Sequence, residues 1–396
     1  MAKALFLSLP LHGHTNPSLP LVHELVGRGD EVIYYSTVTF AEKIAQTGAS
    51  YRPYRNDFLT DLRQLPERLE ELSWLFMRTT EDLLGSELAA FRAERPDYLI
   101  TDSVAPWGQW LGEILGVPVV TSVSTFAFNR RVLAYAVSHG VRPKSAGLVL
   151  SKIRHISKAL WLGRRLSRRY RVKGPGITGL VFGRSALNIV YTSRLFQPFG
   201  ETFDERFEFV GPSVSAPPKI GRSVKGESPV VYVSLGTLFN ADATFFRNCF
   251  EAFKDMDVRV IMSIGSNVPE ASLGQAPQNF SVQAYVPQLD VLQRASVFVT
   301  HGGMNSVSES LYYGVPLLVV PQMSEQEVVG RRVEELGAGL YLAKAKVTAA
   351  TLRESVEQVL AEERFAEQAA VVRASFLAAG GVTRAADAIM AFTRTV

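Results

Sequence analysis

Two histidines, His12 and His14, flank Gly13 directly after an apolar run near the start of the chain. A neutral imidazole accepts a proton near neutral pH, so a histidine held where a strand turns into a helix is suited to general base catalysis. An ordinary tight turn with two solvated imidazoles explains the same residues. The residue types therefore make each histidine a candidate general base, and evidence from other parts of the chain is needed to choose between them.

Three further stretches place polar residues or glycines directly after an apolar run: "ITDSVAP", "SLGT" and "THGGMNS". In the third, Gly302 and Gly303 let the backbone approach a ligand without a Cβ in the way. Asn305 and Ser306 then open a helix whose first N–H groups favour an anion. The alternative is an ordinary glycine-rich turn with Ser306 as the helix N-cap.

The elements expected to position these stretches alternate between strand and helix in both halves of the chain. Residues 4–10 have a strand pattern and residues 19–29 have a helical pattern that ends at glycine, and similar pairs follow. Such alternation predicts parallel sheets with helices on both faces, in which ligands bind at the carboxyl ends of the strands.

A segment rich in Pro, Ser and Gly, residues 213–229, is expected to be an interdomain linker. It separates a domain at 1–212 from a second domain at 230–379. The helical end of the chain, about 380–396, is expected to pack back on the first domain. We predict an α/β fold of two Rossmann-like domains that face one another, with the four stretches lining the cleft between them.

The composition is that of an ordinary globular protein, with 47% hydrophobic and 20% charged residues, which argues against disorder. Cys249 is the single cysteine, so an intrachain disulfide is excluded and a reducing compartment, the cytoplasm, is expected. The first residues lack the small-residue cleavage site of a signal peptide, and no run of about 20 apolar residues predicts a membrane span. No Cys and His cluster has the spacing of a zinc site.

Residues 114–200 contain no Asp or Glu but fifteen Lys or Arg, nine of them from Lys152 to Lys173. Such a segment could attract anionic lipid, nucleic acid or an acidic substrate. A solvated helical face is the plainer interpretation. Weak attraction of residues 152–173 to a membrane surface, or to an anionic group on a substrate, is the functional one, and no nucleic acid partner is expected.

The stretch Gln283 to Gln326 resembles the donor-binding signature of family 1 nucleotide-sugar glycosyltransferases, which have the GT-B fold. It contains, in order, Pro-Gln, His-x-Gly-x-Asn-Ser, Glu, Gly-Val-Pro and Glu-Gln. The N-terminal segment "GHTNPSLPLVHELVGRGDEV" is similar to the bacterial macrolide glycosyltransferase subgroup. The similarity covers essentially the whole chain, and the GT-B fold that it implies agrees with the two domains expected above.

The resemblance implies which residues hold the donor. Tyr285 stands where many relatives have a tryptophan that stacks on the base, so stacking is retained while the choice between UDP and dTDP stays open. The other implied donor residues are Ser234, Thr237, His301, Gly303, Asn305 and Ser306 for the diphosphate, Glu309 for the ribose, Glu325 and Gln326 for the sugar, and Val286 and Gln288 near the nucleoside.

The resemblance also selects between the two N-terminal histidines. In this family the base is the histidine of Gly-His-x-x-Pro, which here is His14, and Asp102 matches the aspartate that partners it. Such an aspartate fixes the imidazole tautomer and stabilises the imidazolium as it forms. The scheme requires no metal, because backbone amides and hydroxyls would stabilise the leaving diphosphate. Residues 255–257, Asp-Met-Asp, spell the DxD motif of metal-dependent glycosyltransferases but are interpreted as surface charge.

The implied function is that of an inverting glycosyltransferase that moves a hexose, glucose from UDP-glucose foremost, to a hydroxyl of a small lipophilic acceptor such as a macrolide, a flavonoid or another natural product. The nucleotide sugar is a co-substrate, and no further cofactor is implied. The acceptor site is expected among apolar side chains of the first domain, each of which could instead belong to the core: Trp74, Phe76, Met77, Trp107, Phe126 and Phe128.

Other function classes make different demands on the sequence. A GT-B sugar-nucleotide epimerase would bind the donor without an acceptor, and the pairing of His14 with Asp102 argues against it. A Rossmann dehydrogenase needs a GxGxxG turn after a strand, which this chain lacks. A non-catalytic auxiliary protein would carry a broken base or donor motif, whereas both motifs are intact.

Overall fold

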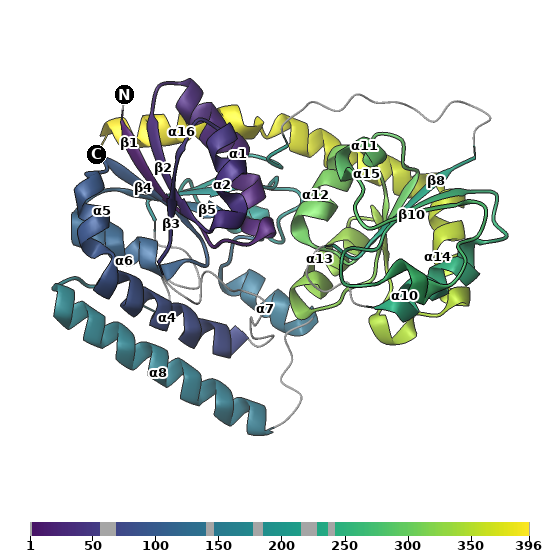
Figure 1. The fold of residues 1–396 in the computed structure, drawn as a ribbon, viewed down its shortest axis with the longest axis horizontal. Helices are drawn as coiled ribbons and strands as arrows, with labels where there is room; N and C mark the ends of the chain where they lie inside the picture. Colours follow the sequence, from purple (N-terminus) through teal and green to yellow (C-terminus); the bar gives the residue numbers. More distant parts are fainter. Residues whose placement is uncertain are drawn as a thin grey trace. The chain divides into compact units, whose positions relative to one another are not determined.

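Two compact units make up the protein in a computed structural model that describes residues 2–55, 69–139, 146–176, 185–214, 228–236 and 242–395; the side chains of 69–70, 146–153 and 395 are not described (Figure 1). The first unit comprises Met1–Ala134, Arg142–Ser215 and Ala379–Val396, and the second comprises Tyr135–Val141 and Ala216–Ala378. In the described ranges, no helix combines the length and the apolar character needed to cross a membrane.

The first unit is built around a parallel sheet with the strand order β3-β2-β1-β4-β5-β6-β7. Its register pairs Leu7 with Thr101 and Asp102 with Ser122, so the carboxyl ends of β1, β4 and β5 lie side by side at one edge. The strands are β1 Lys3–Leu7, β2 Glu31–Ser36, β3 Ser50–Pro53, β4 Tyr98–Asp102, β5 Val119–Val123, β6 Leu187–Val190 and β7 Phe207–Phe209.

Helices cover both faces of this sheet because successive side chains of a strand point to opposite faces. Ala4 and Phe6 of β1 pack with α1 and α16, whereas Leu5 and Leu7 pack on the opposite face with α4 and α6. The helix α8 packs in turn on α4 (Figure 1). The helices are α1 His12–Gly27, α2 Ala41–Gln46, α4 Leu69–Ser86, α5 Leu88–Glu94, α6 Pro106–Leu115, α7 Arg130–His139, α8 Ala146–Tyr170 and α16 Gly381–Thr395, with 3₁₀ turns η1 Val38–Phe40 and η3 Gly200–Thr202.

The first helix begins earlier than the helical pattern of residues 19–29 predicts. It starts at His12 and contains Pro17 and Pro20, residues that usually mark a helix boundary. The backbone N–H groups of His14 and Thr15 both donate to the carbonyl of Leu11, which closes the first turn. His14 therefore lies within the first turn of α1, close to the positive end of the helix dipole.

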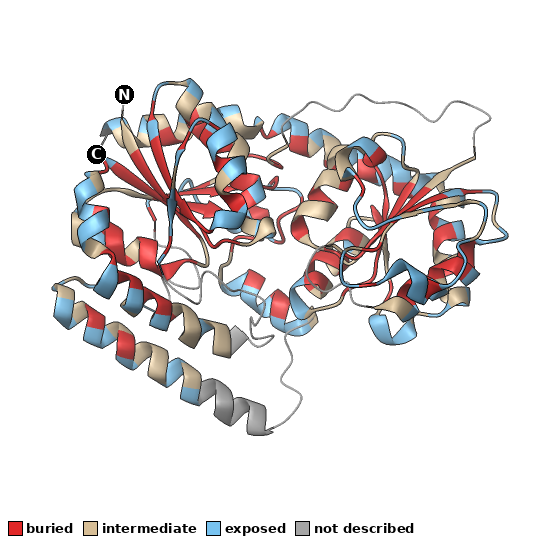
Figure 2. Cartoon of the chain, in the orientation of Figure 1, coloured by how far each residue is buried: buried red, intermediate tan, exposed pale blue. Residues whose placement is uncertain are grey.

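The second unit repeats the parallel arrangement with the strand order β10-β9-β8-β11-β12-β13. Val231 and Val233 of β8 pack with α10 and α14 on one face, and Tyr232 stacks on Phe298 of β11 on the other. Buried residues follow the strands and the inner faces of the helices in both units (Figure 2). The elements are β8 Val230–Ser234, α10 Ala243–Phe253, β9 Arg259–Ser263, η4 Glu270–Leu273, β10 Phe280–Gln283, α11 Gln288–Leu292, β11 Val297–Thr300, α12 Met304–Tyr312, β12 Leu317–Val319, α13 Ser324–Glu335, β13 Gly339–Tyr341, η5 Lys344–Lys346, α14 Ala349–Ala361 and α15 Glu363–Ala378.

Candidate active site

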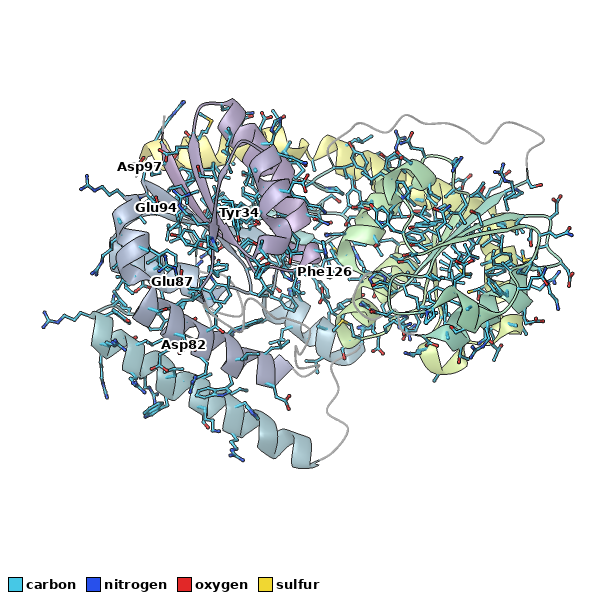
Figure 3. The ribbon with its side chains drawn as sticks, viewed as in Figure 1. Tyr34, Asp82, Glu87, Glu94, Asp97 and Phe126 are labelled. Atoms are coloured by element: carbon cyan, nitrogen blue, oxygen red, sulfur yellow. The ribbon has the colours of Figure 1, made fainter. Side chains whose placement is uncertain are left out.

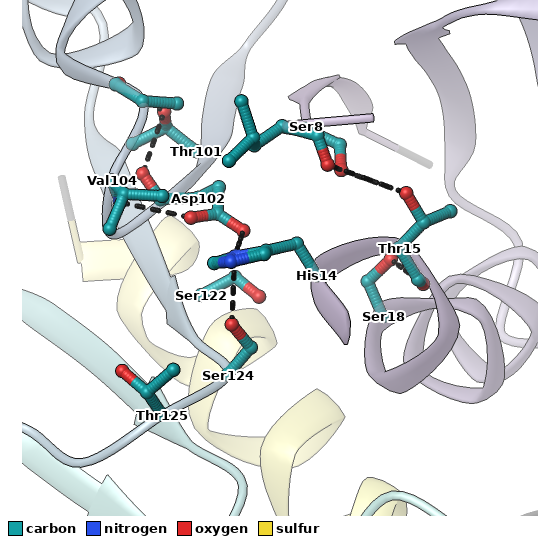
Figure 4. A network of polar contacts seen from close by, with 12 residues as sticks. Ser8, His14, Thr15, Ser18, Thr101, Asp102, Val104, Ser122, Ser124 and Thr125 are labelled. Carbon is teal, nitrogen blue, oxygen red and sulfur yellow. Dashed lines mark hydrogen bonds and ion pairs between the residues drawn. The ribbon is translucent and has the colours of Figure 1, made fainter. Parts of the chain in front are cut away.

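In the first unit, three neighbouring strands bring three polar side chains to one edge of the sheet. His14 follows β1 in the first turn of α1, Asp102 is the last residue of β4, and Ser124 comes directly after β5. Because parallel strands end at the same edge, residues far apart in the sequence meet there. Figure 4 shows the side chains of Asp102 and Ser124 converging on the imidazole of His14.

The imidazole of His14 and the carboxylate of Asp102 form a close pair. Nδ1 of His14 lies 2.8 Å from Oδ2 of Asp102, and the backbone N–H of Val104 donates to Oδ1 at 2.9 Å. Asp102 is 2% exposed, whereas the imidazole is only partly buried. An ionised carboxylate can only accept hydrogen bonds, so Nδ1 of His14 carries the proton and Nε2 keeps its lone pair. This tautomer is the one that can take a proton from a substrate.

Ser124 is a third member of this group that the sequence analysis did not identify. Its Oγ lies 2.9 Å from Nδ1 of His14, and the residue is buried (Figure 4). Since Nδ1 carries its proton for Asp102, the Ser124 hydroxyl oxygen acts as a second acceptor of the same N–H. The signal available in the sequence was the position of Ser124 at the end of the strand pattern "VPVVTSVS", at the edge where His14 and Asp102 were expected.

The loop that carries Asp102 is held by close packing of α6 on β4. The Thr101 hydroxyl donates to the carbonyl of Ala105 at 3.1 Å. A Cβ on Gly108 would lie 2.0 Å from Oγ1 of Thr101, so only glycine allows the helix to approach the strand this closely. The geometry of the Asp102 carboxylate therefore depends on Gly108, which touches neither His14 nor a substrate.

A buried pair of hydroxyl groups attaches the N-terminal half of α1 to strand β2. Ser18 Oγ lies 2.7 Å from the phenol oxygen of Tyr34, a β2 residue with no exposed surface (Figure 3). Burial raises the pKa of Tyr34 to about 12, so the phenol stays neutral and forms a fixed hydrogen bond. On the same side of α1, Ser8 Oγ and Thr15 Oγ1 are 3.4 Å apart (Figure 4).

His12 has a different environment from His14. Its ring meets the edge of Phe40, with the ring centroids 4.9 Å apart. Burial, and after it the positive charge of Lys43, lowers the pKa of His12. None of the described contacts pairs His12 with a carboxylate, which separates it from His14 in chemistry as well as in position.

In the second unit, two glycines enclose the ring of His301. A Cβ on Gly303 would lie 2.5 Å from Nε2 of His301, and a Cβ on Gly236, whose φ is +77°, would lie 2.6 Å from Cε1. The imidazole therefore fits between two stretches of bare backbone at the carboxyl ends of β8 and β11. Burial lowers the pKa of His301 to about 4, with a hydrogen bond to the Ser234 backbone acting in the opposite direction. At neutral pH this ring is a neutral hydrogen-bonding group.

Glu309 belongs to a cluster of polar side chains that spans α11 and α12. Gln288 Nε2 donates to Glu309 Oε2 at 2.5 Å and lies 3.4 Å from the Ser306 hydroxyl. The phenol of Tyr232 donates to the side-chain oxygen of Gln288 at 3.4 Å. Burial raises the pKa of Glu309 to about 6, and the amide of Gln288 acts in the opposite direction. The arrangement presents a carboxylate and an amide at the same edge as the glycines.

The other donor candidates differ in what they present. Tyr285 is 76% exposed, so one face of its ring is open to a flat partner, whereas the side chain of Val286 is buried and leaves only its backbone for contact. Glu325 is exposed on the first turn of α13. Gln326 is buried, and its side-chain oxygen accepts the backbone N–H groups of Gln322 and Met323, so the carbonyl end of this amide is used for helix capping.

Four donor candidates remain. Ser234 ends β8, and its hydroxyl accepts the backbone N–H of Gly236 at 3.2 Å. Asn305 and Ser306 lie in the first turn of α12 and are partly buried. Thr237 lies outside the described residues.

The acceptor candidates divide by burial. Met77, Trp107 and Phe126 are buried, and Trp107 also donates its indole N–H to Tyr54, so these side chains serve the core. Their burial follows from helical and strand periodicity, because a core-facing stripe has the same spacing as a stripe that lines a site. The partly exposed candidates are Trp74, Phe76 and Phe128.

The Asp255-Met256-Asp257 motif lies at the opposite edge of the second sheet. It follows α10 and precedes the amino end of β9, and Asp257 accepts the hydroxyl of Ser228 at 2.8 Å. The glycine-lined His301 is at the carboxyl ends of the parallel strands, so the two features are separated by the length of a strand. Among the residues that the structure describes, no group of three or more His, Cys, Asp or Glu side chains is arranged to hold a metal ion.

Two parallel α/β units, one with a histidine–carboxylate pair and one with a glycine-lined polar site at its strand ends, define a two-domain group transferase. The protein is similar over its full length to the solved structure of CalG4, the calicheamicin glycosyltransferase, with a TM-score of 0.84, 31% identity and coverage of 100% of this chain and 99% of that one. The predicted GT-B fold is confirmed.

Comparisons of sequence identify the family. The chain is 37% identical to the NDP-glycosyltransferase YjiC of Bacillus licheniformis, over 97% of this chain and 96% of that protein. It is 34% identical to the UDP-glucosyltransferase YojK of Bacillus subtilis, over 98% and 97% of the two chains. Residues 247–392 match the family described as "Erythromycin biosynthesis protein CIII-like, C-terminal domain". The chain belongs to the GT-B nucleotide-sugar glycosyltransferases, in the group that includes the macrolide glycosyltransferases.

Proposed function

We propose that this glycosyltransferase is an inverting, metal-independent enzyme that transfers a hexose, glucose from UDP-glucose foremost, to a hydroxyl of a small lipophilic acceptor such as a macrolide, a flavonoid or another natural product. The observation that carries the proposal is the 2.8 Å contact between Nδ1 of His14 and Oδ2 of Asp102 at the carboxyl end of the first sheet. We assign the reaction to the cytoplasm, where Cys249 stays reduced.

His14 acts as the general base. Its Nε2 takes the proton of the acceptor hydroxyl while the hydroxyl oxygen bonds to the anomeric carbon of the donor sugar. The bond from that carbon to the diphosphate oxygen breaks, and the diphosphate leaves with the electron pair. Attack opposite the leaving group inverts the anomeric centre. The carboxylate of Asp102 stabilises the imidazolium that forms, and the hydroxyl oxygen of Ser124 accepts from the same N–H.

The second unit binds the donor in this proposal. The diphosphate meets the backbone around Gly303, the neutral ring of His301 and the first turn of α12, where Asn305 and Ser306 lie. Ser234 and Thr237 contribute from the turn after β8. A neutral His301 donates a hydrogen bond without adding a charge that would have to be desolvated.

The nucleoside and the sugar contact the remaining donor residues. The exposed ring of Tyr285 stacks on the base, with the Val286 backbone and Gln288 beside it. Glu309, held by Gln288, accepts from the ribose hydroxyls. The sugar hydroxyls meet Glu325 and the amide end of Gln326. The partly exposed Trp74, Phe76 and Phe128 line the acceptor site, and the buried Met77, Trp107 and Phe126 support them.

A donor-by-acceptor panel read by mass spectrometry tests the proposal. UDP-glucose, UDP-galactose, UDP-N-acetylglucosamine and dTDP-glucose are each offered with a macrolide, a flavonoid and a simple phenol, with and without a chelator. We expect a mass gain of one hexose from UDP-glucose in the presence of chelator, and β-linked product from the α-linked donor. Product from dTDP-glucose alone, or epimerised UDP-sugar without acceptor, contradicts the donor or the reaction.

The Asp102→Asn variant gives an independent check on the base. An asparagine can present its amide N–H to Nδ1, which moves the imidazole proton to Nε2 and removes the proton-accepting atom. We expect kcat to fall by about 10²-fold or more while donor binding stays near that of the parent. A variant that turned over at the parent rate would show that Asp102 does not set the tautomer of the base.

A further inference from the structure

The helix α8 carries a basic outer face that glycosyl transfer does not use. Its inner face packs against α4, with Leu162 and Leu166 fully buried, so the opposite side of α8 faces solvent. The exposed residues of this side are spaced three, four and seven apart, which places them on one stripe of the helix: Arg154, Trp161, Arg164, Arg165 and Arg168. We call this stripe the α8 basic face.

Charge on the α8 basic face is largely unbalanced. Arg165 pairs with Glu81 of α4 at 3.0 Å and also lies over the ring of Trp161, 5.6 Å from its centroid. Among the described residues, no carboxylate lies within ion-pair distance of Arg154, Arg164 or Arg168. The neighbouring helix α4 carries an exposed negative charge, that of Asp82 (Figure 3). Arg169, Arg171 and Lys173 extend the positive charge beyond the stripe.

The exposed side chain of Trp161 is a second feature of the α8 basic face, independent of its charge. It is 59% exposed in the middle of the α8 basic face. A large indole left in water costs free energy that burial elsewhere would recover. Tryptophan is enriched at membrane–water interfaces, where its ring is buried and its N–H remains hydrated.

We propose that the α8 basic face binds the surface of an anionic phospholipid membrane. The arginines are attracted to the lipid headgroups, and the Trp161 indole enters the interface. The apolar face of α8 stays packed on α4, so α8 does not leave the protein, and the membrane is contacted but not crossed. Nucleic acid carries the same negative charge, but the preference of tryptophan for membrane–water interfaces favours lipid as the partner.

Vesicle sedimentation of the full chain tests the charge component. Vesicles of phosphatidylcholine alone are compared with vesicles of phosphatidylcholine mixed with phosphatidylglycerol. We expect binding to the mixed vesicles only, weaker at higher salt, because screening reduces attraction to the surface. Each arginine removed should lower the partition coefficient about fivefold, so Arg164→Gln with Arg168→Gln should lower it by more than tenfold.

A matched control removes the same charge from the second unit. Arg294 and Lys346 are exposed there, and Arg294→Gln with Lys346→Gln should leave vesicle binding near that of the parent. Circular dichroism verifies that both double variants fold. Equal loss of binding in the two double variants, or equal binding of the parent to both kinds of vesicle, would overturn the proposal.

Tryptophan fluorescence tests the insertion of Trp161. The indole emission should shift to shorter wavelength on mixed vesicles, and Trp161→Phe should abolish the shift while retaining most of the sedimentation. Of the other three tryptophans, Trp107 and Trp110 are buried and Trp74 is partly exposed, so the contribution of Trp161 is the difference between the parent and Trp161→Phe. A shift that persists in Trp161→Phe would contradict the assigned contact. Tight binding to a single-stranded oligonucleotide, lost in Arg164→Gln with Arg168→Gln while vesicles are ignored, would assign the face to nucleic acid instead.

Discussion

His14 and His301 each follow the carboxyl end of a strand in the centre of a parallel sheet, yet the two rings have opposite surroundings. His14 has a buried carboxylate 2.8 Å from Nδ1 and remains partly open to solvent. His301 lies between the backbones of Gly236 and Gly303, and burial lowers its pKa to about 4. The first environment supports a ring that gains a proton during a reaction, and the second supports a ring that stays neutral.

The position of a histidine in the fold brings it to the edge of the sheet where ligands bind, and its neighbours determine the chemistry of its ring there. The carboxylate beside His14 stabilises positive charge as it develops. The glycines beside His301 pack closely on the ring and carry no charge, and desolvation of the ring lowers its pKa, so protonation is disfavoured. In the proposed mechanism, the same residue type at equivalent strand ends thus serves proton transfer in one unit and neutral hydrogen bonding in the other.

Removal of the base should give the largest effect. His14→Ala deletes the proton-accepting Nε2, and we expect kcat to fall by about 10³-fold, within the range for loss of a positioned general base. His12→Ala, the matched control two residues earlier, should stay within a few-fold of the parent because no carboxylate among the described residues pairs with His12. Initial rates at saturating donor measure both. Similar rates for the two variants would remove the distinction between His12 and His14.

Acidification should destabilise the second unit through His301. Its pKa is about 4 in the folded chain and 6.5 in the unfolded chain, so the unfolded state binds the extra proton first as pH falls. The contribution of His301 to the free energy of unfolding is fully present above pH 6.5. It falls by up to about 3 kcal/mol as the pH drops from 6.5 to 4. Glu309, with a pKa raised to about 6, acts in the opposite sense and offsets part of this loss.

Denaturant unfolding at several pH values, with His301→Gln as the control, measures this term. The variant cannot take up the proton, so its free energy of unfolding should change less than that of the parent between pH 7 and pH 4. Proton NMR of the histidine rings reads the pKa of His301 directly, and its signal is the one missing from the variant. A ring that titrates near 6.5 would place His301 in solvent and refute the contrast with His14.

Adding one methyl group to a glycine should affect the two units differently. Gly303→Ala puts a Cβ 2.5 Å from Nε2 of His301, so the ring must move; we expect a loss of about 2 kcal/mol of stability and a raised KM for the donor. Gly13→Ala is the counterpart in the first unit, with nothing within 4 Å of the new Cβ. It should be as stable as the parent or slightly more so. Equal losses in thermal unfolding would mean that the ring of His301 is not confined.

Loss of the Ser124 hydroxyl should have the smallest effect. Ser124→Ala removes one of the two acceptors at Nδ1 of His14 while Asp102 remains, so we expect kcat to fall about two- to tenfold with the donor KM unchanged. Ser124→Thr retains the oxygen and should restore most of the rate. A threonine variant no better than the alanine variant would give Ser124 a packing role only.

Much of the fold could be predicted because its signals are local. The alternation of apolar runs and amphipathic segments predicted parallel strands, and the ends of those strands placed the stretches that contain His14, Asp102 and the glycines. The choice of His14 over His12, with Asp102 as its partner, came from the resemblance to the glycosyltransferase family. The predicted start of α1 was wrong because Pro17 and Pro20, which usually mark a helix boundary, lie inside the helix. Proline penalises helix interiors on average, and tertiary packing of the Thr15 and Ser18 hydroxyls overrode that tendency here.

The parts of the site that could not be predicted depend on contacts across the fold. Nothing near Ser124 in the sequence shows that it lies 2.9 Å from a ring 110 residues away. The fit of His301 between Gly236 and Gly303 likewise joins two loops. Trp107 matched the pattern of a site residue as well as that of a core residue, and only its burial separates the two.

The helix α16 completes the face of the first sheet that α1 covers. Ala385, Ala386 and Ile389 are fully buried there, and Arg28, which directly follows α1, donates to Asp387 and to the carbonyl of Thr383. Residues 381–395 are synthesised after the entire second unit. The sheet that carries the proposed base thus stays open on one side during most of translation, and its final closure waits for the other unit to emerge from the ribosome.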